Sequence, residues 1–237
     1  MGLRGIAVVL MMMVTLTVGA QEEEDSFWSG DVEVGAVFTS GNTEQESIKF
    51  KLGAAREKGN FVNTFHADTF KASEDGNDTA DKLYTFYRLD RKIDDHQAVF
   101  GRLAYEQDEF SGFDKQADIT VGYSRLLLSR DDLNITGDVG LGSKYSKLDT
   151  GESETEALVR LAGQLIWQFS ESARFTQKLD FELGQDLRTT RSTSALETSL
   201  VGNLAMKLAV HVKHNSEVLP GKDKTDTEST VTVVYQF

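Results

Sequence analysis

The sequence of 237 residues has no cysteine and a single proline, Pro220. Without cysteine there is no disulfide framework, no thiolate metal ligand and no thiol nucleophile. With one proline and no proline- or serine-rich segment, no linker is evident, so the sequence predicts one domain. That domain must be stabilised by its fold rather than by covalent cross-links.

Positive charge is also scarce, and no long apolar run follows the first twenty residues. The 25 lysines and arginines are outnumbered by 38 aspartates and glutamates, which gives a net charge of −13. Binding to nucleic acid needs clustered basic residues, so we expect no nucleic-acid partner. A membrane-spanning helix needs about 20 consecutive apolar residues, and no later segment supplies them.

Residues 1–20 have the pattern of a secretory signal peptide. Arg4 precedes an apolar run from Ile6 to Val18, and Val18-Gly19-Ala20 offers the small residues that a signal peptidase prefers. The run is shorter than a spanning helix requires, which favours cleavage after Ala20 over a membrane anchor. The sequence then predicts an acidic, flexible lead-in over 21–27 and a folded domain over 28–237.

Alternating apolar and polar residues fill the rest of the chain. About twelve such segments are separated by turn residues; Val32 to Phe38 and Val231 to Phe237 are two of them. A period of two predicts β-strands with one apolar and one polar face. Many segments are longer than the five or six residues usual in soluble sheets, and a tilted membrane strand needs such a length.

The connections between these segments differ in length in an alternating way. Short ones are expected at 57–60, 93–96, 129–132 and 170–173, and longer polar ones at 73–82, 110–115, 146–154, 187–194 and 217–226. Outer-membrane barrels have short periplasmic turns and longer external loops. The sequence therefore predicts an all-β, antiparallel, up-and-down transmembrane barrel of about 12 strands in the cell outer membrane, with its termini on the periplasmic side. A soluble periplasmic β-sandwich or lipocalin-like binding barrel is the alternative.

Aromatic residues gather at the predicted strand ends, as expected for the two girdles of a membrane barrel. The periplasmic girdle would contain Trp28, Phe61, Trp167, Phe169, Phe175, Tyr235 and Phe237. The external girdle would contain Phe38, Phe70, Tyr84, Phe110 and Tyr145.

The chain ends directly on an apolar strand face that carries Val233, Tyr235 and Phe237. A last strand that pairs with the first leaves no open sheet edge. Phe237 would then lie at the periplasmic rim. A terminal aromatic residue resembles the signal recognised by the bacterial barrel assembly machinery, so we expect these three residues to form a C-terminal assembly signal.

Several short motifs, taken in order, resemble the bacterial family of salt-induced outer-membrane proteins, a family of unknown function. The matching residues are Trp28-Ser29-Gly30, Thr39-Ser40-Gly41-Asn42-Thr43, Tyr105 with Asp108, Phe110 and Gly112, Pro220-Gly221-Lys222, Thr225-Asp226-Thr227 and Phe237. The resemblance covers about residues 27 to 237. It implies a barrel in a Gram-negative outer membrane and a link to salt stress, but no reaction and no ligand.

Patterns for catalysis and metal binding are weak. A general base needs a nucleophile within hydrogen-bond reach, and no nucleophile motif accompanies the histidines at 66, 96, 211 and 214. The acidic residues in 74–81 do not have the spacing of a Ca²⁺ loop. We therefore expect no enzyme activity and no cofactor, and a solvated loop at 74–81 that divalent ions could bridge to lipopolysaccharide.

Charges on the predicted inward face nearly balance. The basic residues are Lys49, Lys51, Arg88, Arg102, Lys144, Arg160, Arg174, Lys178 and Lys213. The acidic residues are Glu33, Asp68, Asp90, Glu106, Asp118, Asp138, Glu156, Asp180, Glu182 and Glu197. Cross-strand ion pairs between them would partly fill a narrow lumen.

Two functions fit such a lumen. One is a narrow, weakly selective pore, leaning slightly towards cations because acidic loops at its mouth attract them. The other is a non-conducting structural or surface-recognition barrel. In either case the expected partners are outer-membrane lipid, lipopolysaccharide and the barrel assembly machinery; the sequence does not indicate an oligomeric state.

Overall fold

The computed structural model describes residues 26–39, 45–108, 111 and 113–237, which form twelve antiparallel strands. In these residues no helix is long and apolar enough to cross a membrane. The strands are β1 (Ser26–Thr39), β2 (Gln45–Lys58), β3 (Phe61–Glu74), β4 (Asn77–Asp94), β5 (Gln97–Asp108), β6 (Phe113–Ser129), β7 (Leu133–Leu148), β8 (Ser153–Gln168), β9 (Ala173–Leu183), β10 (Arg188–Val201), β11 (Leu204–Asn215) and β12 (Thr225–Gln236).

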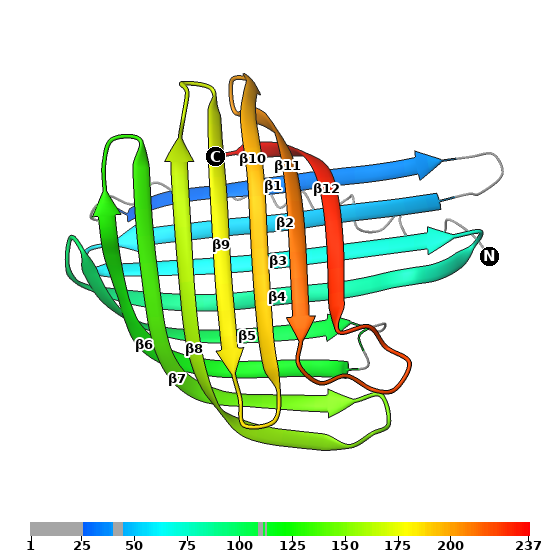
Figure 1. The fold of residues 1–237 in the computed structure, drawn as a ribbon. Coiled ribbons are helices and arrows are strands. Elements are labelled where there is room, and N and C mark those ends of the chain that lie inside the picture. Colours follow the sequence, from blue (N-terminus) through cyan, green and yellow to red (C-terminus); the bar gives the residue numbers. More distant parts are fainter. Residues whose placement is uncertain (1–25, 40–44, 109–110, 112) are drawn as a thin grey trace, which may run out of the picture.

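Each strand pairs with its neighbours in sequence, and β1 pairs with β12, so the sheet closes into a barrel. Figure 1 shows the wall β8 to β12 crossing the opposite wall β1 to β5 at a steep angle, as expected for the tilted strands of a closed barrel. The predicted all-β, twelve-stranded antiparallel barrel is therefore confirmed.

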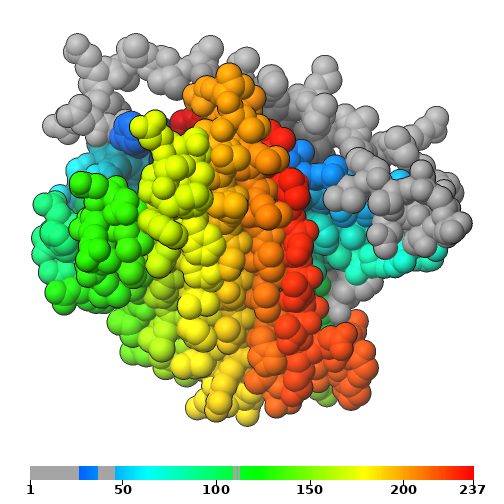
Figure 2. Space-filling view, turned by 45° about the horizontal axis from the view of Figure 1, so that its top comes forward, coloured from blue at the N-terminus to red at the C-terminus, as the bar shows by residue number. Residues whose placement is uncertain are grey.

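The outer surface of the barrel is apolar. Val121 and Leu141 are each 63% exposed, and large apolar side chains are exposed on all twelve strands. Figure 2 shows β8 to β12 side by side as one continuous outer wall. Soluble monomers rarely expose continuous apolar surface on this scale, whereas membrane barrels present such a belt to lipid. Val233, Tyr235 and Phe237, which form the apolar face at the end of the chain, are 50–52% exposed.

The barrel closes where Gly30 of β1 meets Phe237. Gly30 N–H donates to the Phe237 carbonyl at 2.8 Å, and Phe237 N–H donates to the Gly30 carbonyl at 3.0 Å. A Cβ at position 30 would lie 2.5 Å from the Phe237 ring and 2.6 Å from the Gly53 carbonyl oxygen. Glycine at 30 thus leaves room for the terminal ring on the outer face of the closing strand pair.

Three of the predicted long loops are wrong, and in one of them, 146–154, β7 runs to Leu148 and β8 begins at Ser153, so that only four residues connect the strands. Residues 73–82 hold a two-residue turn, Asp75-Gly76, between β3 and β4; both residues have positive φ, as in the tight hairpin turns that match strand twist. Residues 187–194 belong almost wholly to β10, which is polar there on both faces but remains paired with β9 and β11. The nine-residue connection 216–224 is the longest one between described strands.

The side chains predicted for the two aromatic girdles agree with the structure at one rim and only in part at the other. At the rim that carries Ser26 and Phe237, here called the terminal rim, Trp28, Phe61 and Trp167 are exposed on the outer face. At the opposite rim, here called the distal rim, Tyr145 is exposed as predicted. Phe70 and Tyr84, however, share the inward parity of their strands; Lys49 Nζ lies 5.8 Å from the Phe70 ring, and Tyr84 lines the lumen. Phe110 and the side chain of Phe38 lie outside the described residues.

Replacing Gly30 by valine should destabilise the barrel at its closure. The added side chain would compete with the Phe237 ring and the Gly53 carbonyl, and overpacking of this kind typically costs about 1–3 kcal/mol. Gly101→Val is the matched control, because a Cβ at 101 would meet no atom within 4 Å. Urea unfolding of the barrels in lipid vesicles measures both variants; equal stability of the two would contradict the role assigned to Gly30.

Candidate functional site: the charged lumen

The lumen contains a cavity of about 540 Å³. Its lining reaches Lys82 and Asp226, near the distal ends of β4 and β12. It also reaches Thr136 and Gln164, which lie three and four residues from the terminal-rim ends of β7 and β8. The cavity therefore extends along most of the barrel rather than forming a pocket at one mouth.

Basic and acidic residues line this cavity in nearly equal number, as predicted. The nine basic residues are Lys49, Lys51, Lys82, Arg88, Arg102, Arg160, Lys178, Arg191 and Lys213. The eight acidic residues are Asp68, Asp90, Glu106, Asp108, Asp138, Asp180, Asp226 and Glu228. With aspartate, glutamate, lysine and arginine ionised, the lining carries one net positive charge.

One group of ion pairs joins strands next to the closure of the barrel. Glu33 on β1 accepts hydrogen bonds from Lys51 Nζ at 2.6 Å and from Lys207 Nζ at 2.5 Å, so two ammonium groups share one carboxylate. Lys49 on β2 lies 2.7 Å from both Asp68 and Glu228. These contacts connect β11, β12, β1, β2 and β3 on the inner side.

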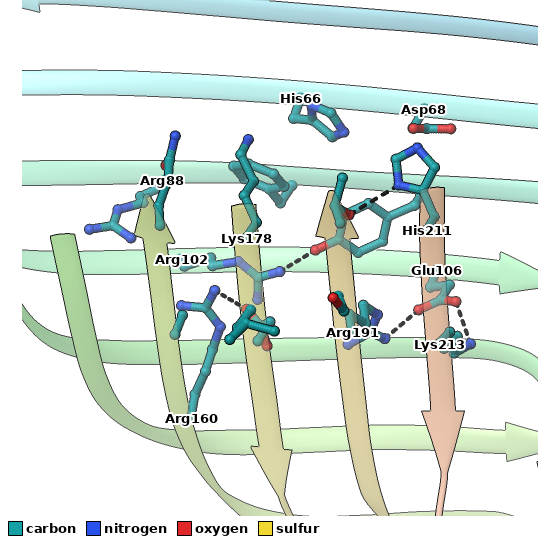
Figure 3. Close-up of a pocket in the computed structure, with 18 of the residues that line it drawn as sticks. His66, Asp68, Arg88, Arg102, Glu106, Arg160, Lys178, Arg191, His211 and Lys213 are labelled. Carbon is teal, nitrogen blue, oxygen red and sulfur yellow. Dashed lines mark hydrogen bonds and ion pairs between the residues drawn. The ribbon is translucent and has the colours of Figure 1, made fainter. Parts of the chain in front are cut away.

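A second group crosses the lumen near the distal rim. Lys144 on β7 donates to Glu182 on β9 at 2.9 Å, and both side chains are at most 3% exposed. Arg191 on β10 contacts Glu182 at 2.7 Å and Glu106 of β5, on the opposite wall, at 2.6 Å. Figure 3 shows Glu106 held between Arg191 and Lys213. In addition to the predicted ion pairs between adjacent strands, the lumen therefore contains pairs that join opposite walls of the barrel.

A third group is built from arginines on the β4 to β9 wall. Arg88 contacts Asp90 at 2.7 Å and also pairs with Asp138, and its guanidinium lies 4.1 Å from the centre of the Phe100 ring. Phe100 is buried against Gly122 and Gly140, where any Cβ would approach the ring. The two glycines therefore let an aromatic ring and an arginine stack inside the lumen.

The four histidines occupy three environments. His66 and His211 line the cavity; His66 stacks on Phe86 with ring centroids 5.0 Å apart, and His211 Nδ1 lies 3.0 Å from Thr193 Oγ1. His96 is in the turn between β4 and β5. His214 is exposed on the outer face and contacts Thr225. Within the described residues no group of three or more His, Asp or Glu side chains is arranged to hold a metal ion.

The residues that carry the family resemblance lie far apart. Trp28 and Gly30 are at the terminal rim, where Arg56 lies 5.4 Å from the Trp28 ring. Asp226 is near the distal rim, 4.0 Å from Lys82. Residues 40–43 lie outside the described residues. Barrel closure thus explains why position 30 is a glycine. The described residues of these motifs do not come together in one site.

Several lumen residues were missed in the sequence. Arg191 fell within the expected loop 187–194, and Lys82 within the expected loop 73–82. Continuing the alternation of β10 back from Glu197 would have placed Arg191 inward, and continuing that of β4 back from Arg88 would have placed Lys82 inward. Lys207, Asp226 and Glu228 have inward parity as well. The alternation of inward and outward residues thus continues to the ends of these strands, but those ends are polar and resemble loops in composition.

Replacing Glu182 by glutamine should strongly destabilise the protein. It leaves Lys144 and Arg191 with one fewer buried anion, and breaking a buried pair typically costs about 3–5 kcal/mol. Asp114→Asn is the control, because the Lys147–Asp114 pair is solvent-exposed and should contribute little. Urea unfolding in vesicles compares them; a Glu182→Gln protein as stable as Asp114→Asn would show that the lumen pairs do not stabilise the barrel.

Comparison with solved structures places this fold among outer-membrane barrels. The NanC porin superposes with a TM-score of 0.53 at 14% identity, over 87% of this chain and 98% of that one. The translocator domain of the autotransporter NalP from Neisseria meningitidis gives 0.51 at 11% identity, over 89% and 86%. The COG4313 outer membrane channel from Pseudomonas putida F1 gives 0.50 at 10% identity, over 92% and 97%. At these identities the likeness concerns the fold.

Two sequence comparisons agree over nearly the whole barrel. The uncharacterized protein YdiY of Escherichia coli (strain K12) is 24% identical over 211 residues, which cover 89% of this chain and 83% of that protein. A family model described as "Protein of unknown function, DUF481" matches residues 32–237, from β1 to the C-terminal residue. The chain therefore belongs to the DUF481 family of proteins of unknown function.

Proposed function

We propose that this protein is a narrow channel of the bacterial outer membrane with weak charge selectivity. The observation that carries the proposal is the polar cavity that extends along most of the barrel, between the ends of its strands. Cavities lined by charged and polar groups hold water. An ion or small solute inside would exchange its hydration for contacts with these groups.

The charge of the lining argues for weak selectivity. Nine basic and eight acidic residues face the cavity. A permeant cation and a permeant anion would therefore each pass residues of both charges. Acidic residues outside the lumen raise the cation concentration at the mouths and oppose the single positive charge inside. The two effects have opposite signs and leave a small net preference, which leans towards cations if the mouths dominate.

A non-conducting structural barrel is the second candidate. The pairs from Glu106 to Arg191 and Lys213 cross the lumen near the distal rim, and Lys144 and Glu182 are fully enclosed there. If these bridges close the passage, the barrel would reinforce the envelope instead of conducting. A role under salt stress, which the family resemblance suggests, is compatible with either candidate.

We also propose how the barrel reaches its membrane. Residues 1–20 would be removed on export, and the assembly machinery would recognise Val233, Tyr235 and Phe237 on the outer face. The apolar belt would then contact outer-membrane lipid, and the distal rim would contact lipopolysaccharide. The exposure of these three side chains, at the strand pair that closes the barrel, supports their recognition as an assembly signal.

Purified protein in planar bilayers should show discrete conductance steps. Because the chain has no cysteine, Thr136→Cys introduces a single thiol into the cavity lining. A charged, thiol-specific reagent should then lower the step size in that variant. Val139→Cys, on the outer face of the same strand, is the control and should not respond. Silence of the wild-type protein at all voltages, or no response at Thr136→Cys, would refute the channel.

Changing Phe237 to lysine should reduce the amount of folded protein in the outer membrane severely. A charge on the outer face at the rim removes the proposed signal and is costly near lipid. Gln236→Lys is the control, because Gln236 points inward and its amide donates to Glu197 at 2.7 Å, where a lysine would find an acid. Heat-modifiable gel mobility of outer-membrane fractions measures both. Equal yields would rule out the assembly signal.

A further inference from the structure

We propose that the lumen contains a binding site for the carboxylate of a small, hydroxyl-bearing monoanion, centred on Lys178. This inference deepens the proposed function, since it names the class of solute that the same cavity would bind. It rests on three features: an unpaired cation, a row of neutral hydrogen-bonding groups beside it, and an aromatic wall within its reach.

Lys178 differs from every other lumen cation that the structure describes. The others each have a carboxylate within 4.0 Å: Lys49, Lys51, Lys82, Arg88, Arg102, Lys144, Arg160, Arg174, Arg191, Lys207 and Lys213. Lys178 has none among the described residues, and its side chain is exposed to the cavity. An anion that bound there would not have to displace a protein carboxylate.

The surroundings of Lys178 are short of negative charge. Lys51 and Lys207 are close enough to interact with it electrostatically, and these two already share Glu33. Lys178 therefore adds a third ammonium group beside two that already share one carboxylate. This part of the lumen can therefore accept one further negative charge, whereas a second one would meet the acids of the remaining lining.

Neutral polar side chains flank Lys178 in one row across the sheet. The strand register aligns Thr136, Gln164, Lys178, Thr193 and His211 on successive strands from β7 to β11, and all five line the cavity. His211 contacts Thr193 through Nδ1, which leaves Nε2 for another partner. The side chains of Thr136 and Gln164 form no hydrogen bond with any described residue. Such groups can donate hydrogen bonds to, and accept them from, the hydroxyls of a solute whose carboxylate binds Lys178.

An aromatic wall lies within reach of this row. In Figure 3 the Lys178 side chain extends from β9 towards the wall that carries His66. His66 stacks on Phe86 and meets the Tyr84 ring edge-on, with centroids 6.1 Å apart. These rings offer a flat, weakly polar surface to the carbon skeleton of a bound solute. The cavity of about 540 Å³ lies within the range of about 300–1,000 Å³ typical of small-molecule sites.

Gluconate is the probe of choice, since it has one carboxylate and several hydroxyls, and sorbitol is its uncharged counterpart. Isothermal titration calorimetry of the detergent-solubilised barrel should show binding of gluconate but not of sorbitol. Lys178→Gln should weaken gluconate binding at least about tenfold, because it removes a charged hydrogen-bond donor. Lys178→Arg should retain binding. Lys147→Gln, which removes the same charge from an exposed pair outside the cavity, should bind like the wild type.

Lys178→Gln should fold normally, since it breaks no ion pair, and heat-modifiable mobility verifies this. Equal binding of gluconate and sorbitol, or unchanged gluconate binding by Lys178→Gln, would overturn the inference. The channel proposal can fail separately: a barrel that binds gluconate through Lys178 but shows no conductance steps would retain the site and refute the channel. A conducting barrel that does not bind gluconate would retain the channel and refute the site.

Discussion

The closure of β1 on β12 is the contact that makes this sheet compatible with a membrane. Backbone N–H and C=O groups exposed to hydrocarbon have no water to bind, so a sheet in a membrane must have no open edge. The paired hydrogen bonds between Gly30 and Phe237 complete that closure. Once the barrel is closed, the period of two in each strand divides the side chains into an apolar outside and a polar inside.

Charges on the inside must then be satisfied within a confined space. A buried charge is costly unless it is paired, and in this lumen nearly every cation has a carboxylate partner. Because the barrel is narrow, some partners come from the opposite wall, as with Glu106 and Arg191. The same pairing that stabilises the barrel therefore narrows its passage and cancels most of its charge. Lys178 is the exception that gives the cavity a distinct chemical character.

Much of this architecture could be predicted from the sequence, because alternation reports directly on which face each residue occupies. Strand number, the inward position of Glu33 and Lys178, and the outward position of Phe237 follow from parity alone. Loop lengths do not follow from parity, because polar strand ends such as 187–194 have the composition of loops. The Asp75-Gly76 dipeptide is a strong hairpin signal, but the acidic residues around it have the composition of a long loop. Contacts across the lumen, such as Lys213 with Glu106, depend on barrel diameter and tilt, which a linear pattern does not encode.

The proposed channel requires that a charge-balanced lumen remain open as a narrow passage. The most direct measurement is the reversal potential of the purified protein in a planar bilayer with a tenfold KCl gradient. A small reversal potential, close to zero compared with that of an ideally selective membrane, is predicted from nine basic and eight acidic lining residues. A potential near the ideal value for either ion would contradict the account, because it would mean that residues other than these face the passage.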